Sequence, residues 1–339
     1  MKWTLYPVAR FSDFAADWGE LSASMPAALA PDFVGPLLAT FGVPRALLAC
    51  CRAEGRLLAM GVLVPQGRGW ATLQPAQAPL GLWLQAPGAD LDAMLRSLLR
   101  ALPGRPPLLS LTQLDPDLLP RPRDTGRVRT LDYIDTARIT LAGGFEDYWQ
   151  SRGKNLRGNL KKQRARLARE DIVPRLEIVR EPGAMAAAVA DYAGLEAAGW
   201  KAGSGTAVTP GDAQSRFYGA MLEAFAQRGA ARAYRYWYGE RLAAMDLCIE
   251  DERCLIVLKT AYDETVAAGT SPALLMREEA TAALFSDGRL RRIEFYGRVM
   301  EWHLRWTQEV RRLYHVNYYR WPLLARAHAW LRARSHARS

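Results

Sequence analysis

The two halves of this chain carry similar residues in the same order, and this repeat limits the possible folds more than any other feature. One set of matches, on a helix, pairs Phe33, Gly35, Leu38 and Phe41 with Phe217, Gly219, Leu222 and Phe225. A second set, on two strands, pairs Arg56-Leu57, Ala59-Met60, Arg68 and Leu73 with Arg241-Leu242, Ala244-Met245, Arg253 and Leu258. Because both sets fall on the same predicted elements, we interpret them as a tandem duplication of one α/β unit.

Hydrophobic periodicity and turn residues predict similar elements in both halves. The first half is expected to hold strands at 3–8, 46–52, 57–64, 69–74, 107–113 and 127–141, and helices at 12–24, 31–41 and 89–102. The second half is expected to hold strands at 175–180, 231–238, 242–250, 254–259, 292–296 and 313–320, a long basic helix to about 170, and helices at 184–198, 212–227 and 271–286. We therefore expect an α/β (α+β) fold with mixed, mostly antiparallel sheets flanked by helices. The expected domains are residues 1–142 and 143–322, followed by a basic tail at 323–339.

Composition narrows the class of protein. The 339 residues are 50% hydrophobic, which suits two globular domains, and the net charge of +10 favours anionic partners such as phosphate-bearing cofactors, nucleic acid, acidic glycans or a membrane surface. No apolar run is long enough to cross a membrane, and the first residues lack the apolar core of a signal peptide. The cysteines form no CxxC pair and the histidines lack metal-ligand spacing, so we expect a cytoplasmic protein with buried thiols and no metal.

One stretch, 253–276, has the features of an anion site. A run of β-forming residues from Cys254 to Lys259 leads into a polar loop with Gly269, and Ser271-Pro272 predicts the start of a helix. Loop and first-turn N–H groups would converge there, and the helix dipole adds partial positive charge. The alternative is an ordinary strand-to-helix connection. The corresponding part of the first copy, 74–80, has two prolines that lack N–H donors, so the working site is expected in the second half.

Several segments of the second half resemble a known enzyme family. They are Leu258–Glu264, Ser271–Leu275, Arg152–Leu160, Leu195–Lys201 with Gly205–Ala207, and Leu304–Thr307. These segments look like the GNAT acyltransferases associated with bacterial cellulose and exopolysaccharide synthesis. The two-unit arrangement also resembles the Fem-type peptidoglycan aminoacyltransferases.

The resemblance implies tandem GNAT-like domains and acyl transfer from acyl-CoA or acetyl-CoA to an amine or hydroxyl. We expect the first domain to be degenerate, without a working site, in view of its prolines. In GNAT enzymes the strand before the loop bonds the pantetheine, which here implies Leu258, Lys259, Thr260 and Ala261. The loop and helix hold the diphosphate, which implies Val266, Ala267, Ala268, Gly269, Thr270, Ser271 and Ala273. The common GNAT loop has several glycines after a basic residue, whereas this one has only Gly269. Fem-type enzymes have a modified loop and use aminoacyl-tRNA, which is the alternative donor.

Acyl transfer needs a neutral amine, a held oxyanion and a protonated leaving thiolate. Glu196, at the end of a helix beside Trp200, is the first candidate base; alternatively it caps the helix or pairs with Lys201. Asp263 is a candidate for orienting the acceptor or for capping a turn. Tyr262 is a candidate proton donor to the thiolate or a packed side chain. His303, expected on or next to a strand, is a candidate for proton transfer or a satisfied histidine of the core or surface.

The basic helix carries eight cationic residues before its first acid: Arg152, Lys154, Arg157, Lys161, Lys162, Arg164, Arg166 and Arg169. It is either a solvated face or a clamp for coenzyme A phosphates, an acidic acceptor or tRNA. The expected acceptor-binding residues are Trp200, Lys201, Arg157, Lys161 and Arg305. The leading hypothesis is an acyl-CoA-dependent transferase acting on a sugar, glycan, amino acid, peptide or natural-product intermediate. The alternatives are an aminoacyl-tRNA-dependent transferase and a non-catalytic module that binds an anionic polymer.

Overall fold

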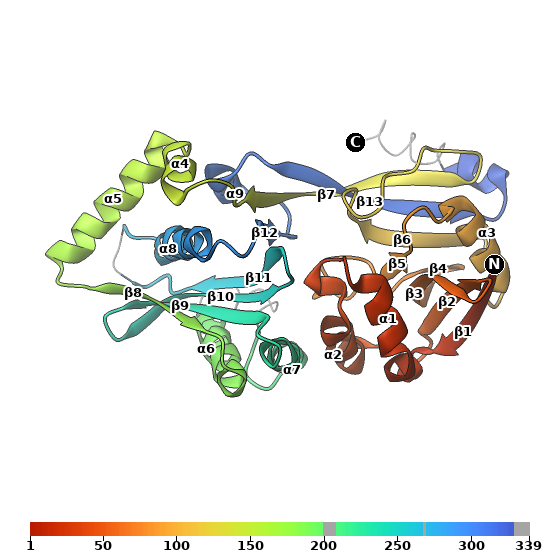
Figure 1. The fold of residues 1–339 in the computed structure, drawn as a ribbon, viewed down its shortest axis with the longest axis horizontal. Coiled ribbons are helices and arrows are strands. Elements are labelled where there is room, and N and C mark those ends of the chain that lie inside the picture. Colours follow the sequence, from red (N-terminus) through yellow and green to blue (C-terminus); the bar gives the residue numbers. More distant parts are fainter. Residues whose placement is uncertain (199–207, 267–268, 329–339) are drawn as a thin grey trace. The chain divides into compact units, whose positions relative to one another are not determined.

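The computed structural model describes residues 1–198, 208–266 and 269–328 (Figure 1). The chain forms two compact units, and the division between them is not a single cut. Unit 1 contains Met1–Asp135 and the chain from Arg311 onward, whereas unit 2 contains Thr136–Val310. The last strand of the chain therefore returns to the first unit, unlike the contiguous domains at 1–142 and 143–322 that we expected.

Unit 1 is a mixed sheet with helices packed on it. Its strands lie in the order β1-β2-β3-β4-β6-β13, and β5 pairs with β3. The strands are β1 (Lys2–Pro7), β2 (Leu47–Ala53), β3 (Arg56–Gln66), β4 (Gly69–Thr72), β5 (Trp83–Gln85), β6 (Leu108–Leu114) and β13 (Val310–Tyr319). The helices are the 3-10 helix η1 (Val8–Phe14), α1 (Ala15–Ser22), the 3-10 helix η2 (Ala27–Leu29), α2 (Pro31–Phe41) and α3 (Leu91–Ala101).

Unit 2 has the strand order β7-β12-β11-β10-β9-β8. Its strands are β7 (Val128–Thr140), which enters unit 2 at Thr136, β8 (Pro174–Val179), β9 (Ala231–Tyr238), β10 (Arg241–Glu250), β11 (Cys254–Tyr262) and β12 (Arg292–Phe295). Its helices are α4 (Phe145–Gln150), α5 (Lys154–Arg169), the 3-10 helix η3 (Pro182–Ala184), α6 (Met185–Ala198), α7 (Ala213–Ala226), α8 (Pro272–Asp287) and α9 (Glu301–Trp306). Helices α5 and α8 lie on one face of the sheet, and α6 and α7 lie on the other (Figure 1).

Strand pairing confirms the duplication. The pairs β1/β2, β2/β3 and β3/β4 are antiparallel and β4/β6 is parallel; β8/β9, β9/β10, β10/β11 and β11/β12 repeat these directions. Both copies even carry a β-bulge at the third residue of a strand, Leu58 in β3 and Ala243 in β10. The helical matches Phe33 and Phe217 are both fully buried. Each unit has its own hydrophobic core, and the repeated alanines Ala59 and Ala244 belong to these cores.

Three local expectations were wrong. The first helix expected at 12–24 is a 3-10 helix followed by the short α1, because the chain tightens around the buried Phe11. The basic helix is interrupted before α5, where Gly153 has an extended backbone. His303 lies in α9 and not on a strand, because its ring nitrogen accepts the Met300 N–H that begins this helix, although the ring packs against Phe295 of β12. In the described part of the chain, no helix combines the length and apolar character needed to span a membrane.

Candidate active site

The centre of the candidate site is an unpaired strand edge in unit 2. Strand β11 pairs in parallel with β12 only over Cys254–Ile256, and β12 ends at Phe295. Strand β11 continues to Tyr262, so Val257–Tyr262, called the free edge below, pairs with β10 on one side and with no described strand on the other. A bulge leaves Leu258 without a partner in β10. All four residues expected to bind pantetheine, Leu258 to Ala261, lie on the free edge.

The loop after the free edge leads to the N-terminus of α8. Ser271 is the N-cap and Pro272 the first helical residue, as the sequence indicates. The Ser271 N–H donates to Oε1 of the buried Gln163, at 2.7 Å, so a side chain of α5 already occupies this amide. Expected diphosphate ligands Ala267 and Ala268 lie outside the described residues. The other four are placed around this turn: Val266 is buried, Gly269 is exposed, and Thr270 and Ala273 are half-buried.

Gly269 permits an arginine to approach the loop. Its backbone φ is +80°, a left-handed conformation that favours glycine, and a Cβ there would lie 2.6 Å from Arg166 Nη1. Arg166 also donates to Glu170, at 2.7 Å, one turn further along α5. Its guanidinium thus supplies the positive charge that the loop sequence itself lacks. No residue spacing predicts this contact, because Arg166 and Gly269 are far apart in the chain.

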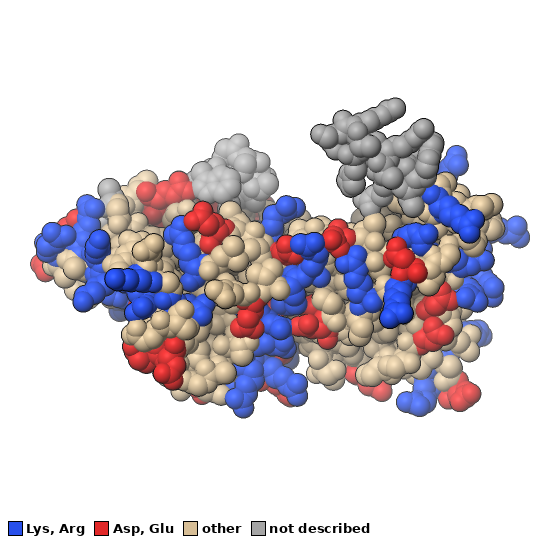
Figure 2. All heavy atoms as spheres, turned by 90° about the horizontal axis from the view of Figure 1, so that it is seen from above, with Lys and Arg blue, Asp and Glu red and all other residues tan. Residues whose placement is uncertain are grey.

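Helix α5 is held by part of its basic set and exposes the rest. Arg164 bonds Glu278 and Glu279 of α8, at 2.6 and 2.8 Å. Arg157, an expected acceptor ligand, instead bonds Gln150 and the Arg152 carbonyl oxygen at the start of the helix. The exposed cationic residues of α5 are Lys154, Lys161, Lys162 and Arg169. Figure 2 shows Lys and Arg gathered at the end of unit 2 that carries α5.

The candidate base Glu196 is buried at the end of α6. Its carboxylate accepts the Tyr192 hydroxyl at 3.0 Å and the Val208 N–H at 2.7 Å. The Tyr192 hydroxyl also lies 3.3 Å from the carbonyl oxygen of Thr260, on the free edge. Burial, together with the Glu196 charge, raises the pKa of Tyr192 far above its ordinary value, so the phenol keeps its proton. One hydroxyl therefore lies between the candidate base and the free edge.

A buried ion pair between β10 and α8 contacts the free edge. Asp246 of β10 pairs with Arg277 of α8 at 2.6 Å, and both side chains are almost fully buried. The Thr260 hydroxyl donates to the same carboxylate at 2.5 Å. Burial raises the pKa of Asp246, although Arg277 opposes the shift. A carboxylate within the apolar strand Ala243–Ile249 is a sequence signal that could have identified this group.

The remaining expected residues are placed as follows. Asp263 caps a turn: its oxygens accept from Thr265 and Arg241, and these hydrogen bonds outweigh burial and lower its pKa. Tyr262 is 42% exposed at the end of the free edge, so the alternative of a packed tyrosine is wrong. Lys259 extends over the Tyr218 ring, 5.7 Å from its centroid. Arg305 pairs with Glu301 on the surface of α9, at 3.0 Å. Trp200 and Lys201 lie outside the described residues.

His303 is a buried structural histidine in this arrangement. Its Nδ1 accepts the Met300 N–H at 3.0 Å, and its ring stacks on Trp302. Burial lowers the pKa of His303 to about 4, with Arg277 adding to the shift and the Met300 hydrogen bond opposing it. The imidazole is therefore neutral near neutral pH and poorly suited to protonate a thiolate. Within the described ranges, no three His, Cys, Asp or Glu side chains come together as a metal site.

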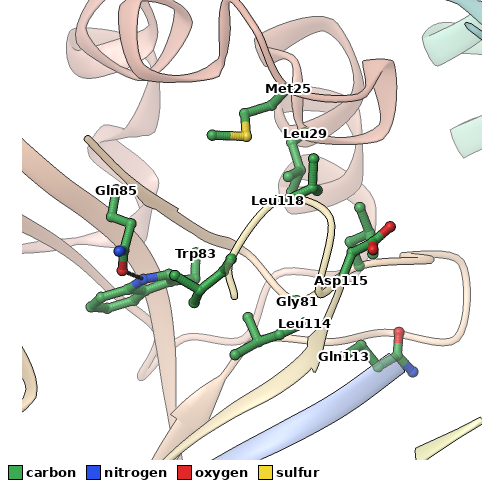
Figure 3. A pocket seen from close by; sticks show the side chains of 11 residues that line it. Met25, Leu29, Gly81, Trp83, Gln85, Gln113, Leu114, Asp115 and Leu118 are labelled. Atoms are coloured by element: carbon green, nitrogen blue, oxygen red, sulfur yellow. Dashed lines mark hydrogen bonds between the residues drawn. The ribbon is translucent and has the colours of Figure 1, made fainter. Parts of the chain in front are cut away.

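Unit 1 fills the equivalent opening with its own chain. Strand β4 pairs in parallel with β6 at Trp70 and Ala71, as β11 does with β12, but residues 80–82 then enter the gap. The Gly81 N–H donates to the Gln113 carbonyl oxygen, and the Leu82 carbonyl oxygen accepts from Val62. A small cavity remains there, lined by side chains that include Met25, Leu29 and Trp83 (Figure 3).

Comparisons with known proteins agree with this geometry. Residues 154–304 match the family model described as an acetyltransferase (GNAT) domain. No curated protein matches the sequence at a significant level. Similar solved structures include the C-terminal domain of a protein named as a lysylphosphatidylglycerol synthetase from Agrobacterium fabrum, with 12% identity over 90% of this chain and 92% of that chain and a TM-score of 0.56.

Two further structures share the fold. FemX has 9% identity over 94% of this chain and 97% of that chain, with a TM-score of 0.52. L-PGS from Bacillus licheniformis has 11% identity over 85% of this chain and 90% of that chain, with a TM-score of 0.50. At these identities the structures show a common fold and no common substrate. The family match identifies residues 154–304 as an acetyltransferase (GNAT) domain, and the fold of the chain is the one shared by these structures.

Proposed function

We propose that the chain transfers an acyl group from acyl-CoA to an amine of a sugar, amino acid, peptide or related intermediate. The observation that carries this proposal is the free edge of β11, with a buried carboxylate, Glu196, linked to it through the Tyr192 hydroxyl. A free strand edge offers unpaired backbone N–H and C=O groups to a pantetheine arm, which has amides of its own. A role in exopolysaccharide synthesis is part of the proposal, because the family resemblance suggests it.

In this proposal acyl-CoA supplies the thioester, and the chain's own groups do the rest. Glu196 accepts a proton from the incoming ammonium, and Tyr192 holds the carboxylate in place. Backbone N–H groups near the Leu258 bulge point to the carbonyl oxygen; such a donor lowers the barrier by about 3 kcal/mol. Tyr262, exposed at the end of the free edge, is the candidate for returning a proton to the thiolate. We propose no catalytic role for Asp263 or His303, whose polar atoms are used in a turn and a helix cap.

The diphosphate of coenzyme A fits the loop in part. Arg166 lies against Gly269 and offers a cation, and the α8 dipole favours an anion at its N-terminus. The Ser271 N–H, however, is bonded to Gln163, so this side chain must move before that amide can meet a phosphate. Arg166 is therefore the expected main ligand. The four free, buried cysteines fit a cytoplasmic enzyme.

Calorimetry with coenzyme A tests this proposal directly. We expect binding in the micromolar range that weakens in Arg166→Gln and is unchanged in Arg169→Gln, an exposed arginine of the same helix. Turnover should then follow with acetyl-CoA and a panel of amines. Absence of any coenzyme A binding to the purified, folded chain would rule out this donor.

The occupied Ser271 amide favours a second candidate, an aminoacyl-tRNA-dependent transferase. Such a donor carries no coenzyme A diphosphate, so Gln163 could stay on Ser271, and the exposed cations of α5 could meet phosphates. Binding of tRNA should then weaken steeply with salt, and Lys161→Gln with Lys162→Gln should flatten that dependence. If tRNA binds without salt dependence, or not at all, this candidate fails.

A further inference from the structure

Unit 2 has an arginine-lined recess at the end of β11 opposite the free edge. It has a volume of about 700 Å³ and is lined by Arg138, Thr140, Glu252, Arg253, Arg289, Arg291 and Arg292. These residues come from the start of β11, the start of β12, the end of β7 and the turn after α8. None of them was assigned to donor or acceptor binding. We call this feature the arginine recess.

Backbone hydrogen bonds hold the main chain of its central arginines in place. The Arg253 carbonyl oxygen accepts the N–H of Arg291 at 2.6 Å and that of Arg292 at 3.1 Å. The Arg291 carbonyl oxygen in turn accepts the Leu141 N–H at 2.8 Å, and Thr140 pairs with Arg292 in the sheet. The like-charged side chains therefore start from neighbouring strands and cannot move apart at the backbone.

Acidic partners neutralise only part of this charge. Arg138 pairs with Glu309 at 3.3 Å. Arg289 bonds Glu250, but that buried carboxylate also bonds Arg232. Among the described residues, neither Arg253 nor Arg291 has an acidic side-chain partner, and both are exposed at the recess. Two guanidinium groups are thus available, and each can present a planar pair of N–H donors to a phosphate.

The fold does not require these arginines. In unit 1 the parallel pairing of β4 with β6 corresponds to that of β11 with β12. The positions equivalent to Arg291 and Arg292 are Pro107 and Leu108 there, whereas Arg253 and Arg289 have basic counterparts in Arg68 and Arg105. The same turn is therefore built without Arg291 and Arg292, so the fold alone does not account for these two arginines.

We propose that the arginine recess binds a phosphate-bearing molecule of about nucleotide size, separately from the acyl donor. The recess is much larger than a single inorganic phosphate, and its free cations lie on adjacent strands. Two phosphate groups, or a phosphate with a second anionic group, match two available arginines. A compact ligand suits this site because its lining residues face a common hollow and do not extend as a stripe along one element.

Inorganic pyrophosphate is the probe that tests this site, with calorimetry at low salt on the full chain. We expect one binding event, weakened about a hundredfold when Arg253→Gln and Arg291→Gln are combined, since each lost charged contact costs about tenfold. Arg68→Gln, at the repeat-equivalent position of unit 1, is the matched control and should bind as the parent does. Circular dichroism and thermal melting show whether each variant is folded.

A second variant separates this site from the donor loop. If pyrophosphate binding survives in Arg166→Gln but is lost in the combined Arg253 and Arg291 variant, the arginine recess is the site. If Arg166→Gln removes binding and the combined variant retains it, the anion binds at Gly269 and the proposal is overturned. No binding to the parent chain overturns it as well. Competition with adenosine diphosphate then distinguishes a nucleotide ligand from one in which phosphate alone is recognised.

Discussion

At the scale of single residues, Glu196 carries the chemistry. Glu196→Gln removes the basic carboxylate and leaves one amide oxygen, which can accept from Tyr192 or from Val208 but not from both, because these donors bond different carboxylate oxygens. We expect kcat to fall by about a hundredfold or more, with little change in donor KM, because general-base assistance is lost while binding groups remain. Steady-state kinetics checks this. Glu240→Gln, exposed in the β9–β10 hairpin, is the control, and equal activity in both variants would remove Glu196 from the mechanism.

His303 gives a stability signal that depends on pH. Its pKa is lowered from 6.5 to about 4, so the unfolded chain takes up a proton before the folded chain does. The contribution of neutral, buried His303 to the free energy of unfolding is therefore fully present above pH 6.5. It declines as the pH falls towards 4, by roughly 3 kcal/mol in all. His303→Gln should lose less stability over that range in urea titrations. Parallel curves for parent and variant would show that burial of His303 has no such effect.

The sequence predicted single functional residues unevenly, for physical reasons. Glu196 was identifiable because it ends a helix just before a glycine and a tryptophan. Tyr192 was not, because a phenol one helical turn before a carboxylate looks like ordinary packing until the strand edge is placed beside it. Asp263 and His303 looked reactive by residue type, and only the contacts made by their polar atoms show structural roles.

At the scale of elements, the ion pair of Asp246 and Arg277 joins β10 to α8. Asp246→Asn leaves the Arg277 charge buried without a counterion, so we expect a loss of about 3–5 kcal/mol in unfolding free energy. Chemical denaturation measures it. The control is Asp13→Asn, which breaks an exposed pair with Arg10 and should cost at most about 1 kcal/mol. If the two variants lose equal unfolding free energy, the buried ion pair contributes no more to stability than the exposed one.

The loop between β11 and α8 depends on Gly269. Gly269→Ala strains a backbone with φ of +80° and places a methyl group against Arg166. We expect about 1 kcal/mol of destabilisation and about tenfold weaker coenzyme A binding, measured by calorimetry. Gly229→Ala has the same kind of strain, with φ of +70°, but nothing near its Cβ. It should share the destabilisation and spare the binding; weakened binding in both variants would point to strain alone.

Elements were predicted well where local patterns dominate. Helix α2 and the start of β3 match their expected positions, because a proline at the first helical turn and a Glu-Gly hairpin turn mark them. Strand β5 was missed, because three residues among prolines and glycines carry no period-two signal. Helix α9 was not predicted, and His303 was expected on or next to a strand; the cap that His303 makes for this helix is visible only in space.

At the scale of the whole chain, the duplication was predictable from the sequence, but the return of β13 to unit 1 was not. Repeated residues mark helix and strand positions that must be buried in each copy, so they survive in the sequence. The return of β13 to unit 1, where it pairs with β6, depends on partners about two hundred residues apart. No local pattern specifies such a partner, because β propensity describes a strand and not its neighbour.

The duplication also predicts how many donors bind. In unit 1 the chain at 80–82 occupies the gap beside β4. A Cβ at Gly81 would lie 1.9 Å from the Thr112 carbonyl oxygen, so the backbone of this segment packs closely against residue 112 and has no space to move towards it. In unit 2 the corresponding edge of β11 pairs with no described strand. Calorimetry should therefore give one coenzyme A per chain, and Gly269→Ala should weaken that single event. A second event that persists when Arg253→Gln and Arg291→Gln are combined would mean that unit 1 opens, against the close packing around Gly81.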